Sequence, residues 1–303
     1  MKKLAIALLF LTAVFIFGTS ANGETPTRYS TYTISNQRLV RTQTAYTPVS
    51  SVDHIFGEPL NEPNDIHIDE GNTIYIVSTS EQGGKLIIFN LETEEVEVLG
   101  EDLLTNPTGV HVTGDGDILI ADRGNETAYR MDSDGNVLET FTKPDSPLFG
   151  TDTFSPKKIL GDTRGNVYIL NQGTRGLAQF GPDGAFLGYY GANTIQPTLR
   201  TIIQHTFFTE EQQARIFNLT PPEVTNVALD ARGLIHTVSK GVDDTAVKRL
   251  NISGDNLLPG MYDASDLTDI EVGALGNIYA ISESGMIYEY DRDGNLLFAF
   301  GGQ

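Results

Sequence analysis

Histidine and acidic side chains occur at matching places in a phrase that recurs along this chain of 303 residues. Each phrase carries a turn, and the position five residues before that turn can be compared across the five copies. In chain order these positions are His67, His111, Leu160, Ala228 and Glu271. Two residues earlier in each copy, the positions are Asp65, Gly109, Lys158, Asn226 and Asp269. Imidazole and carboxylate groups are ordinary ligands of divalent metals, so metal binding is the first chemistry to consider.

Side chains two residues apart on a strand point to the same face, so these two sets of positions are expected to lie together. The predicted metal ligands are Asp65, His67, His111, Asp269 and Glu271. Imidazole with carboxylate suits zinc, manganese or iron, and carboxylate with an amide oxygen suits calcium. The alternative is structural, because a histidine on an inner strand can simply hydrogen-bond a neighbouring carbonyl.

A second prediction concerns the residues that open the inner strands, whether or not a metal is bound. These predicted ligand-binding residues are Asp65, Lys158, Asn226 and Asp269. Two sequences of alternating acids before a glycine, beginning at Asp132 and Asp291, are interpreted as hairpin turns and not as calcium loops. A calcium loop needs an acid at its twelfth position, where these segments have Lys143 and Gly302.

The repeated phrase defines the strands that must hold these side chains. Each copy has 15 residues: an alternating apolar stretch, a turn, and a second apolar stretch. The copies begin at Pro63, Pro107, Pro156, Val224 and Leu267, and their turns fall at Asn72, Gly116, Gly165, Gly233 and Gly276. Gly takes a positive φ freely and Asn tolerates it, so one hairpin geometry is predicted for all five.

A further strand pair follows the phrases, most clearly around the Asp-Gly turns at Gly135, Gly184 and Gly294. Each unit therefore contains four short strands. Repeated four-stranded units of this kind are typical of the blades of a propeller. The predicted fold is all-β, a β-propeller with five recognisable four-stranded blades near residues 57–100, 101–150, 151–190, 223–260 and 261–302. The propeller domain as a whole spans 57–303.

The interval between the third and fourth blades contains an insertion at about 191–222 that no longer alternates. Thr209 and Gln212 have the spacing of a capping box, and Arg215 follows near the end of the same segment. The sequence thus predicts a short helical insertion. It either seals a seam as a loop decoration or serves as a substrate lid or partner-docking surface.

The N-terminus and the charge indicate the compartment and exclude one class of partner. Lys2 and Lys3 precede an apolar run to Phe17 and then small residues, so residues 1–21 are predicted to be a secretory signal peptide; an uncleaved anchor is the alternative. With 40 acidic against 20 basic residues, the net charge of −20 opposes nucleic-acid binding. We expect a secreted, extracellular chain that does not span a membrane after cleavage.

The segment from Ile118 to Phe141, ILIADRGNETAYRMDSDGNVLETF, resembles the NHL repeat in its strand, its Asp-Arg-x-Asn motif and its Asp-Gly turn. The resemblance covers about residues 63–300, and the insertion beginning near Phe208 is similar to that of bacterial exported NHL-repeat proteins of the gluconolactonase-like group. Only the second phrase keeps the whole motif. The resemblance implies an NHL-type propeller, usually with six blades.

Only five of these six blades are recognisable in the sequence. Residues 22–56 are an N-terminal extension, and its alternating stretch from Tyr29 to Ile55 is expected to supply strands to a sixth sector. The alternative is a C-terminally truncated version of a longer protein.

The resemblance also implies an enzymatic alternative, because related six-bladed proteins include calcium- or zinc-dependent lactonases and a peptide-amidating lyase. The lactonases' Glu-Gly-Pro opening is not matched, since Glu58 is followed directly by Pro59. The lyase's histidine positions hold Asn64, Thr108 and Lys157 here. We therefore predict an extracellular binding or scaffold module for a protein, peptide or carbohydrate ligand, with a metal-dependent hydrolase or lyase of the lactonase kind as the alternative.

Overall fold

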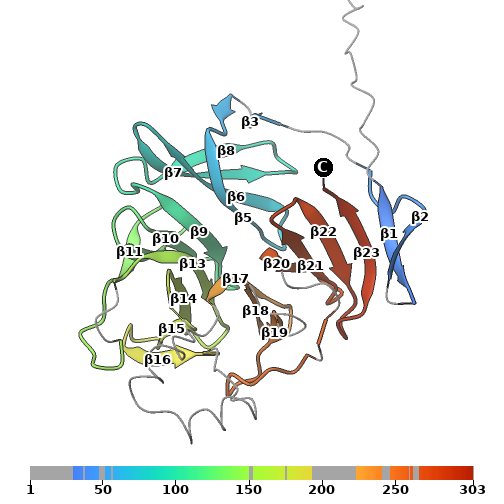
Figure 1. Cartoon of the computed structure of the whole chain (residues 1–303). Coiled ribbons are helices and arrows are strands. Elements are labelled where there is room, and N and C mark those ends of the chain that lie inside the picture. The colour runs from blue at the N-terminus through green and yellow to red at the C-terminus, as the bar shows by residue number, and fades with distance from the viewer. Residues whose placement is uncertain are drawn as a thin grey trace, which may run out of the picture.

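The computed structural model describes residues 30–36, 38–47, 52–55, 57–149, 153–174, 176–192, 223–240, 246–258, 260–261 and 266–302. These residues form short antiparallel strands, and no helix occurs among them. Figure 1 shows the sheets arranged around one centre, with the strands that open each repeat gathered nearest to it. The all-β class predicted from the repeats is confirmed.

Five sheets correspond to the five repeats, and we call them the first to fifth blades. The first blade contains β5 (Glu62–Ile68), β6 (Thr73–Ser80), β7 (Gly83–Asn90) and β8 (Val96–Leu99). The second contains β9 (Pro107–Val112), β10 (Ile118–Asp122), β11 (Thr127–Met131) and β12 (Val137–Phe141). The third contains β13 (Pro156–Gly161), β14 (Val167–Asn171), β15 (Leu177–Phe180) and β16 (Phe186–Tyr190).

The fourth blade differs from the others in its strand number among the described residues, whereas the fifth again has four strands from its own repeat. The fourth blade has three strands among the described residues, β17 (Val224–Leu229), β18 (Ile235–Ser239) and β19 (Val247–Arg249). The fifth contains β20 (Leu267–Val272), β21 (Ile278–Ser282), β22 (Met286–Tyr290) and β23 (Leu296–Gly301). The inner strands β5, β9, β13, β17 and β20 pack against one another in this order.

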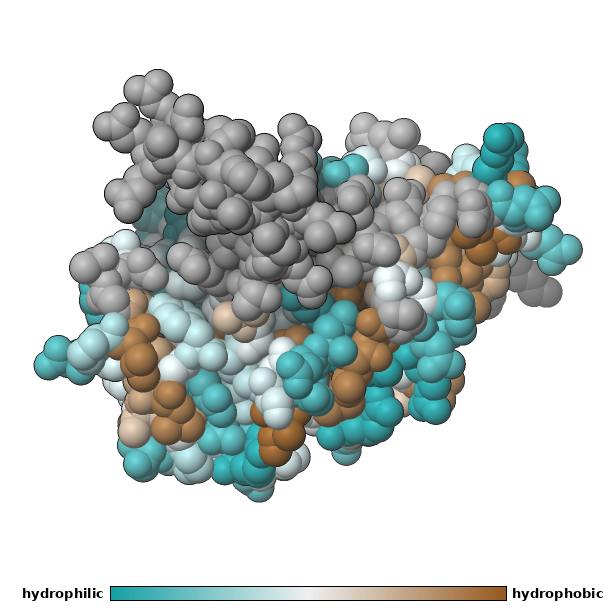
Figure 2. Space-filling view, turned by 60° about the horizontal axis from the view of Figure 1, so that its bottom comes forward, coloured by the Kyte–Doolittle hydropathy of each residue, from teal (hydrophilic) through white to brown (hydrophobic). Residues whose placement is uncertain are grey.

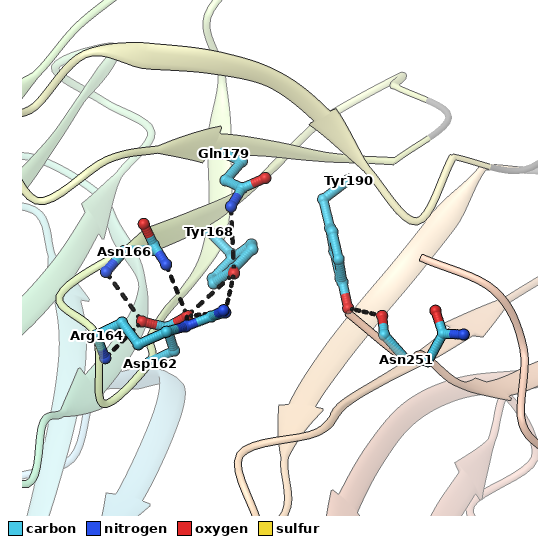
Figure 3. A network of polar contacts seen from close by, with 7 residues as sticks. All are labelled: Asp162, Arg164, Asn166, Tyr168, Gln179, Tyr190 and Asn251. Carbon is cyan, nitrogen blue, oxygen red and sulfur yellow. Dashed lines mark hydrogen bonds and ion pairs between the residues drawn. The ribbon is translucent and has the colours of Figure 1, made fainter. Parts of the chain in front are cut away.

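The hairpin turn in the third blade shows why the phrase folds as it does. Gly165 has a φ of 83°, and its amide donates a 3.0 Å hydrogen bond to the Asp162 carbonyl. The Asp162 carboxylate also accepts hydrogen bonds from the amides of Arg164 and Asn166, at 2.9 and 3.0 Å. Figure 3 shows this carboxylate at the centre of its network, which the Tyr168 hydroxyl joins at 3.1 Å. The predicted left-handed turn is thus confirmed, and Asp162 fixes it.

Neighbouring blades share hydrophobic cores in four places. One core joins the first and second blades around Val77 and Val110, and another joins the second and third around Leu119 and Ile159. The third and fourth blades meet in a cluster that contains Leu160, and the fourth and fifth meet in the largest cluster. Tyr190 of the third blade also donates a hydrogen bond to the Asn251 carbonyl of the fourth (Figure 3).

The N-terminal strands add to the fifth blade and to the first. Strands β1 (Thr31–Ser35) and β2 (Arg38–Thr42) form a hairpin, and β1 pairs with β23 through Tyr32 and Ala299. They therefore extend the fifth sheet at its outer edge. The sequence had predicted that they would supply strands to a sixth sector. The short pair β3 (His54–Ile55) and β4 (Glu58–Pro59) lies against the first blade, because Ile55 packs on Ile76 and Ile87.

The predicted helical insertion is corrected by the structure: the described chain is all-β without a helix. Its basis was one capping-box spacing and a short amphipathic run, and such local propensities are weak evidence beside tertiary context. Residues 193–222, on which most of the insertion falls, lie outside the described residues, as does the predicted signal peptide at 1–21. Over the part of the chain that is described, there is no helix of the length and apolarity that a membrane crossing requires.

The surface carries apolar side chains in separate groups. On the face presented in Figure 2, hydrophobic patches alternate with hydrophilic residues over the described part of the molecule. Leu138 on β12 and Leu187 on β16 are examples of exposed leucines, with 56% and 54% of their surface accessible. Singly exposed apolar side chains of this kind are normal on the surface of a folded domain.

Candidate functional site

A cavity of about 730 Å³ lies where the inner strands converge. Residues from all five blades line it, among them Asp65 and His67 on β5, Lys158 on β13, and Asp269 and Glu271 on β20. Residues five and seven positions before the turn of several repeats thus line one space. We call these two aligned positions the repeat column. We call this space the axial cavity.

A buried ion pair crosses the wall of the axial cavity. Lys158 Nζ donates a hydrogen bond to Asp65 Oδ1, and the Val110 amide donates a 2.8 Å hydrogen bond to Asp65 Oδ2. The two side chains are only 14% and 9% exposed. Burial raises the pKa of Asp65, and the ammonium of Lys158 opposes that shift by favouring the charged carboxylate.

Gly109 makes this pairing between the first and third blades geometrically possible. It occupies the same repeat position as Asp65 and Lys158, on the blade between them. A Cβ at Gly109 would lie 2.8 Å from Lys158 Cα and 3.0 Å from the Lys157 carbonyl oxygen, which is closer than real Cβ contacts allow. The missing side chain therefore lets β13 approach β9 closely, and Lys158 reaches past it to Asp65.

Two imidazoles stand next to the ion pair. The rings of His67 and His111 are 4.9 Å apart between centroids, at an interplanar angle of 66°. His67 lines the axial cavity, whereas His111 is 8% exposed and lies behind it. Burial lowers the pKa of His67 and lowers that of His111 to about 3, so both rings are neutral at neutral pH.

The two acids of β20 form another part of the cavity lining. Asp269 Oδ1 accepts a hydrogen bond from the Asn226 amide group and another, 2.7 Å long, from the Ile270 amide. Glu271 Oε1 accepts a 3.0 Å hydrogen bond from the Val272 amide. Glu271 is accessible from the cavity yet closely surrounded by protein, and this desolvation raises its pKa, with Lys158 acting in the opposite direction.

The structure brings most of the predicted ligand-binding residues together. Asp65, Lys158 and Asp269 line the axial cavity, and Asn226 holds Asp269 without lining it. Sequence reasoning missed Asp230, which also borders the cavity but is committed to its own turn through Arg232 and Leu234. Its signal was present, because an acid three residues before the turn recurs in several phrases.

The predicted metal ligands share the region but do not form a ready coordination site. Asp65, His67, Asp269 and Glu271 line the cavity, and His111 lies behind His67. Among the described residues, no group of three or more histidine and acidic side chains is placed to hold an ion. Asp65 is instead bound to a built-in cation, Lys158, and Asp269 to an amide. The metal site stays a prediction.

Small antiparallel sheets set around a central cavity define a β-propeller. Known structures support this class. Virginiamycin B lyase from Staphylococcus aureus is similar with a TM-score of 0.52 and 13% identity, over 78% of this chain and 69% of that one. Hydrazine synthase from Kuenenia stuttgartiensis has a TM-score of 0.52 and 12% identity, over 80% and 66%. The Cps50 (Swd1) β-propeller domain from Myceliophteria thermophila has 0.51 and 12%, over 76% and 65%.

These similarities concern the fold alone, because enzymes and non-enzymatic proteins share the propeller architecture. No protein-family model matches the sequence, and no curated protein matches it at a significant level. Function must therefore be argued from the axial cavity.

Proposed function

We propose that this chain is an exported, bacterial β-propeller of the NHL-repeat type that binds a protein, peptide or carbohydrate ligand at its axial cavity. The observation that carries the proposal is the cavity of about 730 Å³, which residues of all five blades line and to which the first, third and fifth blades contribute Asp65, Lys158 and Asp269 from one repeat position. Ligand sites are commonly concave and contain a few convergent polar groups. Export is supported by the order of basic, apolar and small residues from Lys2 to Ala21.

Binding is favoured over catalysis because two of the carboxylates that line the cavity are engaged by side chains of other blades. Asp65 holds Lys158, and Asn226 holds Asp269. General acid–base or nucleophilic catalysis needs a reactive group held by an orienting partner and facing the substrate. The net charge of −20 further supports a ligand other than nucleic acid.

The test is ligand-induced thermal stabilisation of the secreted protein. A ligand that binds only the folded state raises the melting temperature in a concentration-dependent way. We expect hits among peptides or oligosaccharides whose shift is lost in Lys158→Met, which changes the cavity wall. The shift should persist in Lys157→Met, which removes the same charge from an exposed neighbour.

Two further measurements separate binding from the enzymatic alternative and test export. Metal analysis of the purified protein, with melting in the presence and absence of a chelator, should show no stoichiometric ion and no change in melting. A bound ion that His67→Ala and His111→Ala release would favour the metal-dependent hydrolase or lyase instead. N-terminal sequencing of secreted material should find a chain that begins after Ala21, and a chain retained at Met1 in the membrane would contradict export.

A further inference from the structure

Among the described residues, one boundary between neighbouring blades has no shared core, the boundary between the fifth blade and the first. Successive blades are joined by hydrophobic clusters from the first to the fifth, but no cluster among the described residues joins the fifth to the first. The outer side of the first blade has its own cluster, which contains only residues of that blade and of segment 55–60. Figure 1 shows β5 and β20 on neighbouring sides of the centre. We call the space between these two strands the fifth–first seam.

The first-blade wall of the seam is apolar. Ile66 and Ile68 on β5 are 54% and 55% exposed, which is unusual for isoleucines on an inner strand. They stand opposite Ile76 and Ile74 of β6 on one sheet face, while Asp65 lies on the other. Ile55 and Leu60 cover the outer part of this face through Ile76, and the part near the axis remains open.

The fifth-blade wall of the seam is acidic. Asp269 and Glu271 alternate along β20 with Ile270 and Val272, whose side chains are buried in the core shared with the fourth blade. The alternation therefore turns both carboxylates away from that core. They line the same cavity as Ile66 and Ile68, so the two walls border one continuous space.

We propose that the fifth–first seam binds an extended peptide segment in which basic and apolar side chains alternate. This inference rests on the proposed binding function and adds the chemistry of the ligand. In an extended chain, successive side chains point to opposite sides. A segment inserted between the walls would therefore direct apolar side chains to Ile66 and Ile68 and ammonium or guanidinium groups to Asp269 and Glu271.

Charge and pairing within the site favour this ligand over an anionic or purely apolar one. The protein's net charge of −20 attracts cationic segments over long range and repels a second copy of itself. Lys158, the basic side chain that lines the cavity among the described residues, is already engaged by Asp65. Among the described residues, the hydrogen bonds of the β20 acids come from the Asn226 amide and from their own strand's amides.

The test uses labelled peptides of about ten residues, the upper end of common strand lengths. One peptide alternates lysine and valine, a second has the same composition in two blocks, and a third alternates glutamate and valine. Fluorescence anisotropy is measured with the full-length secreted protein at about 0.15 M salt, where long-range attraction is screened. We expect the alternating basic peptide to bind at least about tenfold more tightly than the block peptide, and the acidic peptide not to bind.

Paired variants test each wall separately. Ile66→Ser with Ile68→Ser, and Asp269→Asn with Glu271→Gln, should each weaken binding of the alternating peptide at least about tenfold. The apolar control is Leu138→Ser with Leu187→Ser, which alters two side chains of nearly equal exposure on outer strands. The acidic control is Glu101→Gln with Asp102→Asn, which removes the same charge from an exposed loop. Neither control should change the affinity, and melting curves verify that all four variants are folded.

Equal affinity for the alternating and block peptides would overturn the inference, as would an equal loss in the acidic control. Either result would mean that basic peptides bind by overall charge. The proposed function is tested independently by the Lys158-dependent thermal shift. If that shift is found with another ligand while the alternating peptide fails, the seam inference alone is wrong. If both experiments fail, the binding function is wrong as well.

Discussion

Removing Lys158 while keeping Asp65 should strongly destabilise the fold. The Asp65 and Lys158 side chains are 9% and 14% exposed, so their pair is largely removed from water. Breaking a buried ion pair on one side costs about 3–5 kcal/mol, because an uncompensated charge remains. Asp65 keeps its 2.8 Å hydrogen bond from the Val110 amide and borders a cavity that admits water, so we expect the lower end of this range, about 3 kcal/mol, for Lys158→Met.

The double variant Asp65→Asn with Lys158→Met should recover much of this loss, since no buried charge is then left unpaired. Urea unfolding, followed by tyrosine fluorescence and far-UV circular dichroism, gives the four free energies of the double-mutant cycle. We expect a coupling energy of about 2 kcal/mol between Asp65 and Lys158. The exposed control Lys157→Met should lower the free energy of unfolding by about 0.5 kcal/mol or less. Additive costs of the two single variants would refute the view that Asp65 and Lys158 form one buried unit.

The loss of stability caused by Lys158→Met should depend on pH in a defined direction. Burial raises the folded-state pKa of Asp65 above its unfolded value of about 4, so this group's contribution to stability is complete below that value and is lost as pH rises through the folded pKa. Without Lys158 the folded-state pKa of Asp65 rises further, so Asp65 stays protonated in the folded protein up to a higher pH. The cost of Lys158→Met should therefore be smaller at pH 5 than at pH 7.5, and an unchanged cost would contradict this explanation.

Three other changes probe the site and its supports. Gly109→Ala should destabilise the fold by about 1–3 kcal/mol in urea unfolding, because its Cβ would lie 2.8 Å from the neighbouring strand. Tyr46→Phe removes the 2.8 Å hydrogen bond to buried Glu289 and should cost about 1–3 kcal/mol, with faster hydrogen exchange in β22 and β23; unchanged exchange would contradict it. The pKa of His111, about 3 when folded and about 6.5 when unfolded, means that stability is lost as pH falls below about 6.5. From pH 7 to pH 5 the loss should be about 2 kcal/mol, and His111→Gln should remove it.

The repeat column predicted the location of the site because the period of a strand is a local property. Once the turn residues are aligned, the residues five and seven positions earlier must share a face, and this placed Asp65, His67 and Glu271 in the axial cavity. The contact between Lys158 and Asp65 could not be predicted in this way. It depends on how closely β13 approaches β9 at Gly109, and that distance is set by packing between blades.

The pairing of the N-terminal strands was the second feature that sequence patterns could not predict. The alternation between Tyr29 and Ile55 correctly indicated strands, but it carries no information on which edge they join, and β1 pairs with β23. The expected helix failed for a related reason: a capping-box spacing describes a local preference, and local preferences do not determine tertiary structure.

The chemistry of the seam follows from the same alternation that builds the cores. On β20 the even positions Ile270 and Val272 face the preceding blade, so Asp269 and Glu271 must face away from it. On β5 the corresponding even positions are Ile66 and Ile68, but no core among the described residues joins them to a preceding blade. In the middle blades both faces of the sheet pack against a neighbouring blade. At the two ends of the series, the acidic face of β20 and the apolar face of β5 remain accessible among the described residues. The binding chemistry proposed for the seam combines these two faces.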